Sequence, residues 1–327
     1  MRWFCTYFDK NYMVRGLALY NSLKQCCPKF RLCVICLDEV AYSTLVRLNL
    51  TDVLVFALED LEKYDPKLLV AKSNRSLLEY YYTLTPMVNL FVFQHFPQVD
   101  LLTYLDSDLY FFKNPEPLFE ELDGDSISII GHRFPSNLLH LAIHGIYNVA
   151  WLTFRRDADG LECLNWWRDR CLEWCYERLE ENRFADQKYL DDWPDRFSGV
   201  TVLGHKGANV APWNLSQYNV TADGSDVMID NQPLLFFHFH GFRRVVPFIY
   251  DANLSRFGAS ASPVIRQRIF KPYVSAISAA RQLAMGSLQD SDLGRGVREN
   301  EIGLIGRLKY TLRAYQRALK GDFIFVP

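Results

Sequence analysis

Apolar runs separated by polar turns make up the first part of the chain. The runs Trp3–Phe8, Phe30–Leu37 and Val53–Phe56 are short and rich in β-branched or aromatic residues, which predicts three strands. Between them, apolar residues recur at helical spacing over about Met13–Gln25 and Tyr42–Leu48. This alternation of strand and helix predicts an α/β fold in which helices wind a mostly parallel sheet.

The middle of the chain continues this alternation. Helical spacing covers part of Leu61–Tyr82 and then Leu84–Phe93, where Thr85-Pro86 places a proline at the start of the helix. A further helix is predicted over about Gly160–Leu179. Apolar runs predict five more strands, within Leu101–Phe112, Ser126–Ile130, Tyr147–Phe154, Val200–Leu203 and Leu234–Gly241.

The composition changes after about residue 250. Helices are predicted over Pro263–Leu283 and Gly306–Leu319, with a polar stretch between them. We therefore divide the chain into a larger α/β domain, residues 1–250, and a helical extension, residues 251–327. The basic residues of the extension fit a solvated helix face, which we favour, or contact with an anionic membrane surface or an acidic partner. They are Arg266, Arg268, Lys271, Arg281, Arg307, Lys309, Arg313, Arg317 and Lys320.

Composition and charge exclude several classes of protein. The chain has 327 residues, 49% of them hydrophobic, so it can bury one large core. A formal net charge of −2 gives no basic footprint, and we expect no nucleic-acid partner. The eight cysteines, Cys33 and Cys36 among them, predict buried free thiols rather than disulfides or a zinc site. No apolar run reaches the ~18 residues of a membrane span, and the first strand follows Met1 at once, so we expect no signal peptide and a cytoplasmic location.

Two carboxylates interrupt the apolar run Leu101–Phe112. Asp106 and Asp108 are two residues apart, and alternate side chains of a strand share a face, so their Cα atoms would lie roughly 6–7 Å apart. At the carboxyl edge of a sheet, such a pair can hold a hard divalent cation. An Asp-rich turn after a buried strand, with both acids in water, is an equally good interpretation of this segment alone.

Further ligands for such a cation lie near the other end of the domain. His238 and His240 alternate in one predicted strand and would point to the same side. An Asp/Asp/His set with open positions suits manganese or magnesium, and the nearby Arg244 would help to clamp a diphosphate. The competing interpretation is structural, because histidines in apolar strands are usually packed core residues.

Polar residues also follow the first two predicted strands. Asp9, Asn11 and Asp38 fall at strand carboxyl ends, where ligands collect in parallel α/β sheets. Taken singly, each is also typical of a turn or a helix N-cap. The sequence contains no G-x-x-x-x-G-K-[ST] phosphate loop, no G-x-G-x-x-G after the first strand and no G-x-S-x-G elbow. No competing chemistry therefore stands out.

Six motifs in order resemble one family. The chain is similar to the GT-A-fold glycosyltransferases, and most closely to family 8-like retaining enzymes such as glycogenin and the bacterial lipopolysaccharide galactosyltransferases. The likeness covers most of residues 1–245. The matching segments are Asp9–Tyr12 (D-x-N-Y), Tyr104–Asp108 (Y-L-D-x-D), Tyr147–Ala150 (F-N-[AS]-G), Asp186–Leu190 (D-Q-x-x-L), Trp213-Asn214 (W-N) and His238–Arg244 (H-F-x-G-x-x-K).

This resemblance implies a role for each matched residue. It makes residues 1–250 a GT-A nucleotide-sugar-binding catalytic domain, and leaves residues 251–327 for acceptor, membrane or oligomer contacts. The metal ligands would be Asp106, Asp108 and His238, with His240 as an alternative to His238. Asp186 and Gln187 would be the catalytic pair beside the donor sugar. The donor would contact Phe8, Asp9, Asn11, Tyr12, Arg75, Asp106, Ser107, Asn148, Trp213, Asn214, Gly241 and Arg244.

The activity implied by the resemblance is a metal-dependent sugar transfer. Mn²⁺ or Mg²⁺ would assist departure of a nucleotide diphosphate, UDP in this family, and the transfer would retain the anomeric configuration. The acceptor would be a glycan, a lipid-linked molecule or a protein, with peripheral contact at the inner face of the membrane through the basic extension. The alternatives are a sugar nucleotidyltransferase and a catalytically silent nucleotide-sugar-binding protein.

The sequence departs from the family pattern at three places. Arg244 stands where the family has lysine, and Ala150 where it usually has glycine. The arginine usual before the metal strand has no match near residues 81–83, so Arg75 or Lys72 would take its place. The acceptor pocket is expected around His132–Ile146 and the extension.

Overall fold

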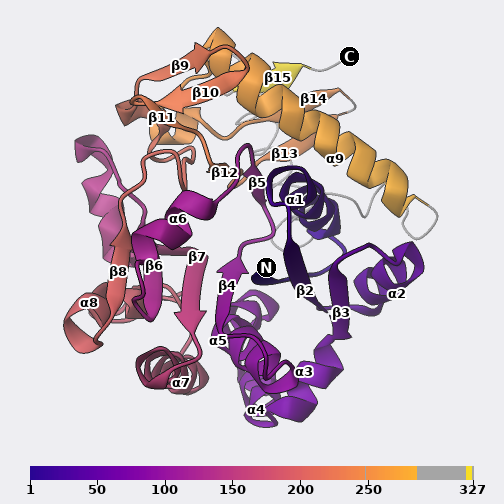
Figure 1. Cartoon of the computed structure of the whole chain (residues 1–327), viewed down its shortest axis with the longest axis vertical. Coiled ribbons are helices and arrows are strands. Elements are labelled where there is room, and N and C mark those ends of the chain that lie inside the picture. The colour runs from indigo at the N-terminus through magenta and orange to yellow at the C-terminus, as the bar shows by residue number, and fades with distance from the viewer. Residues whose placement is uncertain (247, 286–321, 326–327) are drawn as a thin grey trace, which may run out of the picture.

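The fold is built on one central sheet of seven strands. In the computed structural model, residues 1–246, 248–285 and 322–325 are described. The strands of this sheet are β1 (Arg2–Phe8), β2 (Phe30–Cys36), β3 (Val53–Ala57), β4 (Leu101–Leu105), β6 (Ile127–Gly131), β7 (Tyr147–Arg155) and β8 (Val200–Leu203). Their order is β3-β2-β1-β4-β7-β6-β8 (Figure 1). The first four of these run parallel, β7 is antiparallel to both neighbours, and β8 is parallel to β6.

Helices cover both faces of this sheet. They are α1 (Met13–Cys26), α2 (Glu39–Leu48), α3 (Leu58–Tyr64), α4 (Lys67–Asn74), α5 (Leu77–His95), α6 (Glu116–Leu122), α7 (Ala158–Glu173), α8 (Trp193–Arg196) and α9 (Lys271–Ala284). Helices α1 and α9 lie on one side, and α3, α4, α5 and α7 on the other (Figure 1). Each side buries its own apolar core against the sheet. The predicted α/β fold with a mostly parallel sheet is confirmed.

Smaller elements surround the sheet. A two-stranded sheet pairs β5 (Leu109–Phe111) with β12 (Phe236–His238), and two three-stranded sheets lie at the periphery. Those sheets contain β9 (Val220–Asp223), β10 (Asp226–Ile229) and β11 (Gln232–Pro233), and β13 (Arg243–Val246), β14 (Ile249–Asp251) and β15 (Phe323–Phe325). Short 3-10 helices are η1 (Ser136–His144), η2 (Lys188–Asp192), η3 (Leu215–Gln217) and η4 (Ser255–Phe257), and η5 (Ile265–Phe270) is a π-helix.

Local signals set the ends of several helices. The Asp38 carboxylate accepts hydrogen bonds from the amides of Ala41 and Lys10, so it caps α2 and also holds the β1–α1 loop. Helix α5 begins with a capping box in which the Ser76 hydroxyl and the Glu79 carboxylate bond each other's amides. Asp38 therefore has the helix N-cap role that the sequence offered as the alternative to ligand binding.

Helix α5 corrects the prediction for Pro86. The prediction placed Pro86 at the start of a helix over 84–93, but α5 runs from Leu77 to His95 with the proline inside it. Proline has no amide hydrogen for the carbonyl four residues earlier, that of Tyr82. The Thr85 hydroxyl lies 3.3 Å from this carbonyl oxygen and gives it a donor. Twelve of the nineteen residues of α5 are buried, and this burial offsets the cost of the missing bond.

The run Leu101–Phe112 is not one strand. Strand β4 ends at Leu105, Asp106–Asp108 form a turn, and β5 pairs with β12 outside the central sheet. The Asp106 amide donates to the Ala150 carbonyl at the end of the β4–β7 ladder, and the Leu109 amide donates back to the Asp106 carbonyl. The prediction of two carboxylates alternating on one strand is therefore wrong, because the chain leaves the sheet between them.

The last described elements return to the main body. Helix α9 packs against α1 (Figure 1), and β15 pairs with β14. The predicted helix over Gly306–Leu319 lies outside the described residues, and the boundary near residue 250 stays a prediction. Helix α7 ends at Glu173, before the predicted end at Leu179, with Trp174 as its cap.

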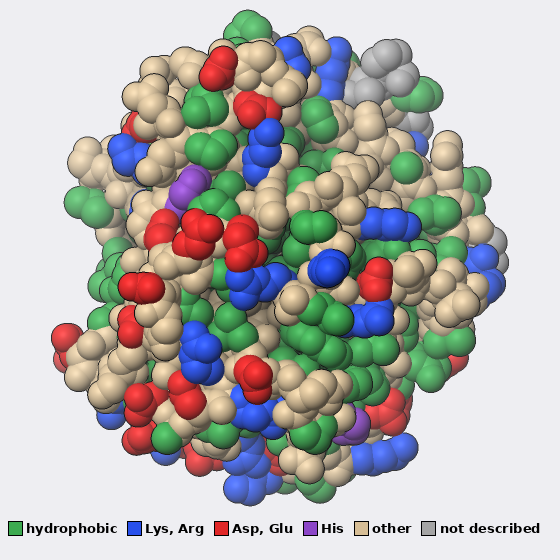
Figure 2. Space-filling view, viewed as in Figure 1, with side chains coloured by type: hydrophobic (Ala, Val, Ile, Leu, Met, Phe, Trp, Pro, Cys, Tyr) green, Lys and Arg blue, Asp and Glu red, His purple; other side chains and the backbone are tan. Residues whose placement is uncertain are grey.

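The cysteines are free thiols, as the composition predicted. All eight cysteines are free thiols, and all except Cys26 are buried. Among the described residues, no helix is long and apolar enough to cross a membrane. Basic and acidic side chains are interspersed over the face shown in Figure 2.

Candidate active site

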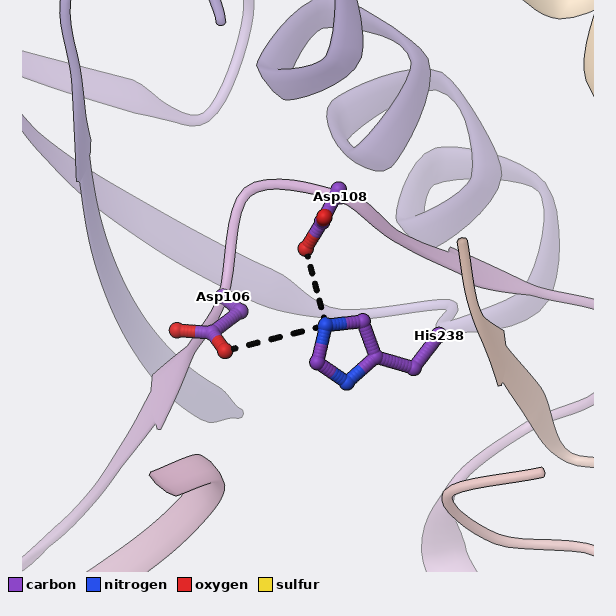
Figure 3. A group of neighbouring side chains, drawn as sticks. All are labelled: Asp106, Asp108 and His238. Carbon is purple, nitrogen blue, oxygen red and sulfur yellow. Dashed lines mark ion pairs between the residues drawn. The ribbon is translucent and has the colours of Figure 1, made fainter. Parts of the chain in front are cut away.

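Strand pairing brings three candidate ligands together. Asp106 and Asp108 lie in the turn that leaves β4, and β5 begins directly after them. The β5–β12 register sets His238 opposite Leu109, one residue from Asp108. The two carboxylates and the imidazole consequently point toward one another from two segments far apart in the sequence (Figure 3).

The three side chains form a compact cluster. His238 Nε2 lies 3.1 Å from Asp108 Oδ1 and 3.9 Å from Asp106 Oδ2. One ligand atom from each residue lies within 4.8 Å of the other two. Asp108 and His238 are 7% and 3% exposed, so a turn is present but it does not place Asp108 in water.

The electrostatics of this cluster correspond to a cation site. Burial raises the pKa of Asp108, but the charge and hydrogen bond of His238, with smaller contributions from His240 and Arg15, together outweigh it and lower the pKa. Burial raises the pKa of Asp106 to about 6, since His238 offsets burial only in part and Asp108 adds to it. Asp108 and Asp106 outweigh the effect of burial on His238 and raise the pKa of its imidazole. The imidazolium thus supplies the positive charge that a bound metal would bring.

The donor set fits a divalent metal ion. Two carboxylates and one imidazole nitrogen are suitable ligands, and the remaining positions stay open for water or phosphate oxygens. The indole ring of Trp213 packs edge-on against His238 with centroids 5.1 Å apart, which fixes the orientation of the imidazole. His238 Nδ1 is a buried nitrogen with no hydrogen-bond partner among the described residues.

His240 does not join this cluster. Strand β12 ends at His238, so the expected alternation of two histidines on one strand does not occur. The His240 ring contacts Trp213, at 5.4 Å between centroids, and lies 5.9 Å from the His238 ring. His238 is therefore the histidine that the fold brings to the two aspartates.

The carboxyl end of β1 lies next to this cluster. The Asp9 carboxylate is buried and accepts hydrogen bonds from the amides of Asn11 and Tyr12 and from the Asn11 side chain. The Tyr12 ring lies under the Arg15 guanidinium. Burial raises the pKa of Tyr12, Arg15 opposes this shift, and the charges of Asp108 and Asp106 add to it. The Phe8 ring packs so closely on α1 that a Cβ on Gly16 would lie 2.2 Å from it.

Asn148 and Gln187 meet at the end of β7. The Asn148 Nδ2 atom lies 3.2 Å from Gln187 Oε1 and 3.2 Å from His132 Nε2. Gln187 in turn donates to the His144 carbonyl at 3.2 Å. Burial lowers the pKa of His132 to about 3, so its ring is neutral and can accept from Asn148. The structure therefore joins these two sequence-predicted residues directly.

Asp186 is buried close to the same cluster. Its Oδ2 atom lies 2.7 Å from Thr85 Oγ1, and its carbonyl accepts from the Trp167 indole. Burial, with a contribution from the charge of Asp106, raises the pKa of Asp186 to about 7. The residue before it, Ala185, has a φ of 49°, a strained conformation for a non-glycine residue. Strain of this kind is often found at functional sites.

The sequence is similar to two proteins of Bacillus subtilis. The chain is 31% identical over 274 residues to the uncharacterized protein YfnD of Bacillus subtilis (strain 168), covering 83% of this chain and 87% of YfnD. The chain belongs to the YfnD family. The uncharacterized protein YfnF of the same organism is 32% identical over 250 residues, covering 74% of this chain and 82% of YfnF. No model of a protein family matches the chain.

One solved structure shares the fold of this chain, and a second gives a weaker match. The WbbM bifunctional glycosyltransferase in its apo form matches 86% of this chain and 51% of its own, with 13% identity and a TM-score of 0.51. Mouse xyloside xylosyltransferase 1 in its apo form matches 73% of this chain and 98% of its own, with 13% identity and a TM-score of 0.44. At this identity the WbbM likeness shows a shared glycosyltransferase fold.

Two other residues of this YfnD-family chain that were predicted to bind the donor sugar nucleotide lie close to the cluster. Their side chains form hydrogen bonds to backbone groups. The Trp213 indole donates to the His132 carbonyl, and the fully buried Asn214 amide binds the carbonyls of His132 and Asn209 and the amide of Ala211. Their observed role is to hold the loop that carries Trp213 against His238.

The remaining predicted donor residues have different surroundings. Ser107 is buried within the Asp106–Asp108 turn. Gly241 follows His240 with a φ of +68°, and a Cβ there would lie 2.5 Å from Asn253 Nδ2, so glycine is required. Arg244 is half-buried on β13, opposite Tyr250.

Arg75 has a structural role in the fold. Its guanidinium donates to the carbonyls of Cys171 and Leu172 and to the Thr83 hydroxyl. These two carbonyls belong to the last turn of α7, whose carbonyl groups lack helical partners. Arg75 therefore ties α7 to α5, and its hydrogen bonds go to the protein backbone rather than to the Asp106–Asp108–His238 cluster.

Four side chains at the site were not predicted as site residues from the sequence. Tyr7, Thr85 and Tyr104 form hydrogen bonds between Asp186 and Asp106, and His132 anchors Asn148. Tyr104 was noted only as part of its motif. The sequence offered two signals, a polar Thr85 within an apolar helix and two tyrosines near the ends of neighbouring strands. Neither signal indicates a functional site unless the tertiary fold is known.

Proposed function

We propose that this chain is a metal-dependent glycosyltransferase that moves a sugar from a UDP-linked donor to an acceptor hydroxyl with retention. The observation that carries this proposal is the convergence of Asp106, Asp108 and His238 beyond the carboxyl ends of β1 and β4. Ligands of open α/β sheets bind at this edge. The likeness of the sequence motifs to family 8 glycosyltransferases supports the choice of donor and of stereochemistry.

The metal site defines where the diphosphate binds in this proposal. Asp106, Asp108 and His238 would hold Mn²⁺ or Mg²⁺, which when bound supplies positive charge to the departing diphosphate. Arg244 would add a fixed positive charge to the same group. Asp9, Asn11 and Tyr12 would hold the nucleoside, because the β1 end places them beside the cluster.

The sugar would lie between the diphosphate and the Asp186–Gln187 pair. The Asn148–Gln187 contact and the Thr85–Asp186 contact hold both side chains before any ligand binds. Such preorganisation is the main requirement for front-face attack by an acceptor, which depends on positioning and stabilisation of the leaving group more than on a strong base. The acceptor is a glycan, a lipid-linked molecule or a protein.

Calorimetry of UDP binding tests this proposal. The wild-type chain is titrated with UDP with and without manganese, beside Asp108→Ala and the control Asp226→Ala. Asp226 is a surface carboxylate that pairs with Lys113, so its loss leaves the cluster intact. We expect manganese to strengthen UDP binding at least tenfold in the wild type and the control, and to have no effect in Asp108→Ala. UDP binding that is the same with and without manganese in the wild type would refute the metal site.

A second experiment identifies the donor and separates an enzyme from a silent binding protein. Glycosyltransferases of this class hydrolyse their donor slowly in the absence of acceptor, so a panel of nucleotide sugars is incubated with the protein and manganese. Release of UDP from one sugar nucleotide, abolished in Asp108→Ala, would identify the donor. Binding of UDP without hydrolysis of any donor would favour a silent binding protein.

We also propose, as the alternative to the solvated helix face that the sequence favours, that a cytoplasmic protein makes peripheral membrane contact through the basic extension. Part of that basic set has internal partners, since Arg266 donates to the carbonyls of Ala261 and Phe323. Co-sedimentation with anionic vesicles at low salt tests the contact, compared with a chain that ends near residue 260. Equal co-sedimentation of the two chains would contradict this proposal.

A further inference from the structure

The imidazole of His132 lies between a backbone carbonyl and the Asn148 side chain. His132 directly follows β6, and its Nδ1 atom lies 3.3 Å from the Ile146 carbonyl oxygen. Its Nε2 atom lies 3.2 Å from Asn148 Nδ2. The Phe134 ring stacks on the imidazole with centroids 4.7 Å apart, and the Trp213 indole packs edge-on at 5.3 Å. Both ring nitrogens of this histidine are therefore engaged.

The same network continues from Asn148 to Gln187. Asn148 Nδ2 lies 3.2 Å from Gln187 Oε1, and Asn148 Oδ1 lies 3.3 Å from the Ala150 amide nitrogen. Gln187 Nε2 lies 3.2 Å from the His144 carbonyl oxygen. The network thus begins and ends at a backbone carbonyl, that of Ile146 and that of His144. A carbonyl oxygen can only accept a hydrogen bond, so the direction of every bond between the two ends is determined.

The position of each hydrogen follows from these two ends. The His144 carbonyl needs a donor, so Gln187 turns Nε2 toward it and Oε1 toward Asn148. Asn148 must then present Nδ2 to Gln187, and the same Nδ2 faces His132 Nε2, which consequently carries no hydrogen. The hydrogen of the neutral ring is on Nδ1, where it donates to the Ile146 carbonyl. Reversing either amide would set acceptor against acceptor and donor against donor.

We propose that His132 is a positioning residue whose Nδ1–H tautomer fixes the Asn148 amide and, through it, the Gln187 amide. Both side-chain hydrogens of Asn148 are used inside this network. The second hydrogen on Gln187 Nε2 has no partner among the residues that the structure describes, and it would donate to an oxygen of the donor sugar. The contact with the sugar rests on the proposed function, whereas the tautomer of His132 and the orientation of the two amides do not.

The packing around His132 agrees with this role. The ring is 6% exposed, and burial favours its neutral form. Turning the ring over would replace both nitrogens by carbon atoms and lose both hydrogen bonds, and the rings of Phe134 and Trp213 restrict that rotation. The Trp213 indole also donates to the backbone carbonyl of His132 at 2.9 Å and packs on His238. His132 is therefore held by the same indole that contacts the candidate metal site.

Nuclear magnetic resonance of the full chain with ¹⁵N-labelled histidine tests the tautomer. Correlations between ring nitrogens and ring carbon-bound hydrogens distinguish a protonated nitrogen from an unprotonated one, and His132→Gln assigns the signals by their loss. At pH 7 without added metal, we expect Nδ1 of His132 to be protonated and Nε2 to be unprotonated and hydrogen bonded. A ring with a hydrogen on Nε2, alone or together with Nδ1, would overturn the inference.

Hydrogen exchange of the Asn148 side-chain amide tests the positioning. Asn148→Ala assigns its signals. His132→Leu removes one hydrogen bond and should speed this exchange roughly tenfold, whereas His132→Gln keeps a carbonyl acceptor and should restore most of the protection. The control is His205→Leu, because the ring of His205 is half-buried and accepts from the Gly207 amide at 3.1 Å in a different loop. Unchanged exchange in His132→Leu, or equal loss of protection in His132→Gln, would overturn the positioning role.

These measurements separate this inference from the proposed function. The expected tautomer and the loss of protection support it even if no sugar nucleotide is turned over, and a hydrogen on Nε2 overturns it even if the protein is an active transferase. Where a donor is hydrolysed, His132→Leu should lower turnover roughly tenfold while UDP affinity is kept, and His132→Gln should recover most of that activity. Unchanged turnover in His132→Leu would overturn the role of the network toward the sugar.

Discussion

Replacing Asp186 with asparagine should stabilise the protein at alkaline pH and have a smaller effect in acid. Burial raises the pKa of Asp186 in the folded chain to about 7, whereas an aspartate in an unfolded chain titrates near about 3.9. A folded-state pKa above the unfolded value contributes stability that is fully present below pH ~4 and is lost as pH rises through ~7. Asparagine keeps the shape of the neutral acid and does not titrate.

The magnitude follows from the two pKa values. Between pH 5 and pH 8, the folded chain holds the Asp186 proton up to about pH 7 while the unfolded chain has already lost it. Each pH unit in this window changes the free energy of unfolding by about 1.4 kcal/mol. From pH 5 to pH 8 the free energy of unfolding of the wild type should therefore fall by roughly 2.5 kcal/mol relative to that of Asp186→Asn. The side chain is 3% exposed, so no reduction for solvent screening applies.

Urea unfolding at pH 5 and pH 8 without added metal measures this difference. The free energy of unfolding is determined for the wild type, for Asp186→Asn and for the control Asp226→Asn, whose parent carboxylate stays ionised across this range because Lys113 lowers its pKa. The difference in free energy of unfolding between Asp186→Asn and the wild type should grow from pH 5 to pH 8. The same difference for the control should not change. An advantage that is equal at the two pH values would refute a raised pKa at Asp186.

Three further substitutions test the assignments around the site. Trp213→Leu removes the ring that packs on His238 and orients it as a metal ligand. Calorimetry should show manganese binding weakened about tenfold. Unchanged affinity for manganese would show that the ring is dispensable. Gly145→Ala adds a Cβ at a φ of +135° and 3.1 Å from the Gln187 side chain, so donor turnover should fall roughly tenfold while UDP binding is kept, and a parallel loss of both would point to a wider disturbance. Arg75→Met removes the bonds to the end of α7 and should lower the free energy of unfolding by about 2 kcal/mol without changing UDP affinity; weaker UDP binding at unchanged stability would restore a donor-binding role.

The residue types at the site could be predicted from the sequence. Asp106, Asp108 and His238 were predicted as metal ligands because carboxylate and imidazole groups at strand ends suit a divalent cation, and the fold places them in one cluster. The pairing of Asn148 with Gln187 is also consistent with the two motifs that contain them. Chemistry that depends on residue identity can therefore be inferred before the fold is known.

The structure adds most where partners are distant in sequence, and the donor-binding roles of Arg75 and Asn214 stay predictions. Arg75 and Asn214 look like ligand-binding groups, yet their donors bind backbone carbonyls that only the packed structure brings close. His240 was expected to share a strand face with His238, but β12 ends because its partner β5 is only three residues long. Whether a polar side chain is available for a ligand depends on which backbone groups need it, and one-dimensional patterns contain no such information.

By itself, the sequence determined the α/β class, since the period of apolar positions decides strand from helix and the alternation of the two demands a wound sheet. It also indicated two acids and two histidines that could ligate a metal, and the fold then selected His238. Only the tertiary structure decided that Asp106–Asp108 is a buried turn and that Tyr104, Tyr7 and Thr85 join it to Asp186. The physical reason is that hydrogen bonding and desolvation act over a few ångströms in space, between β1, β4 and α5, whatever their separation along the chain.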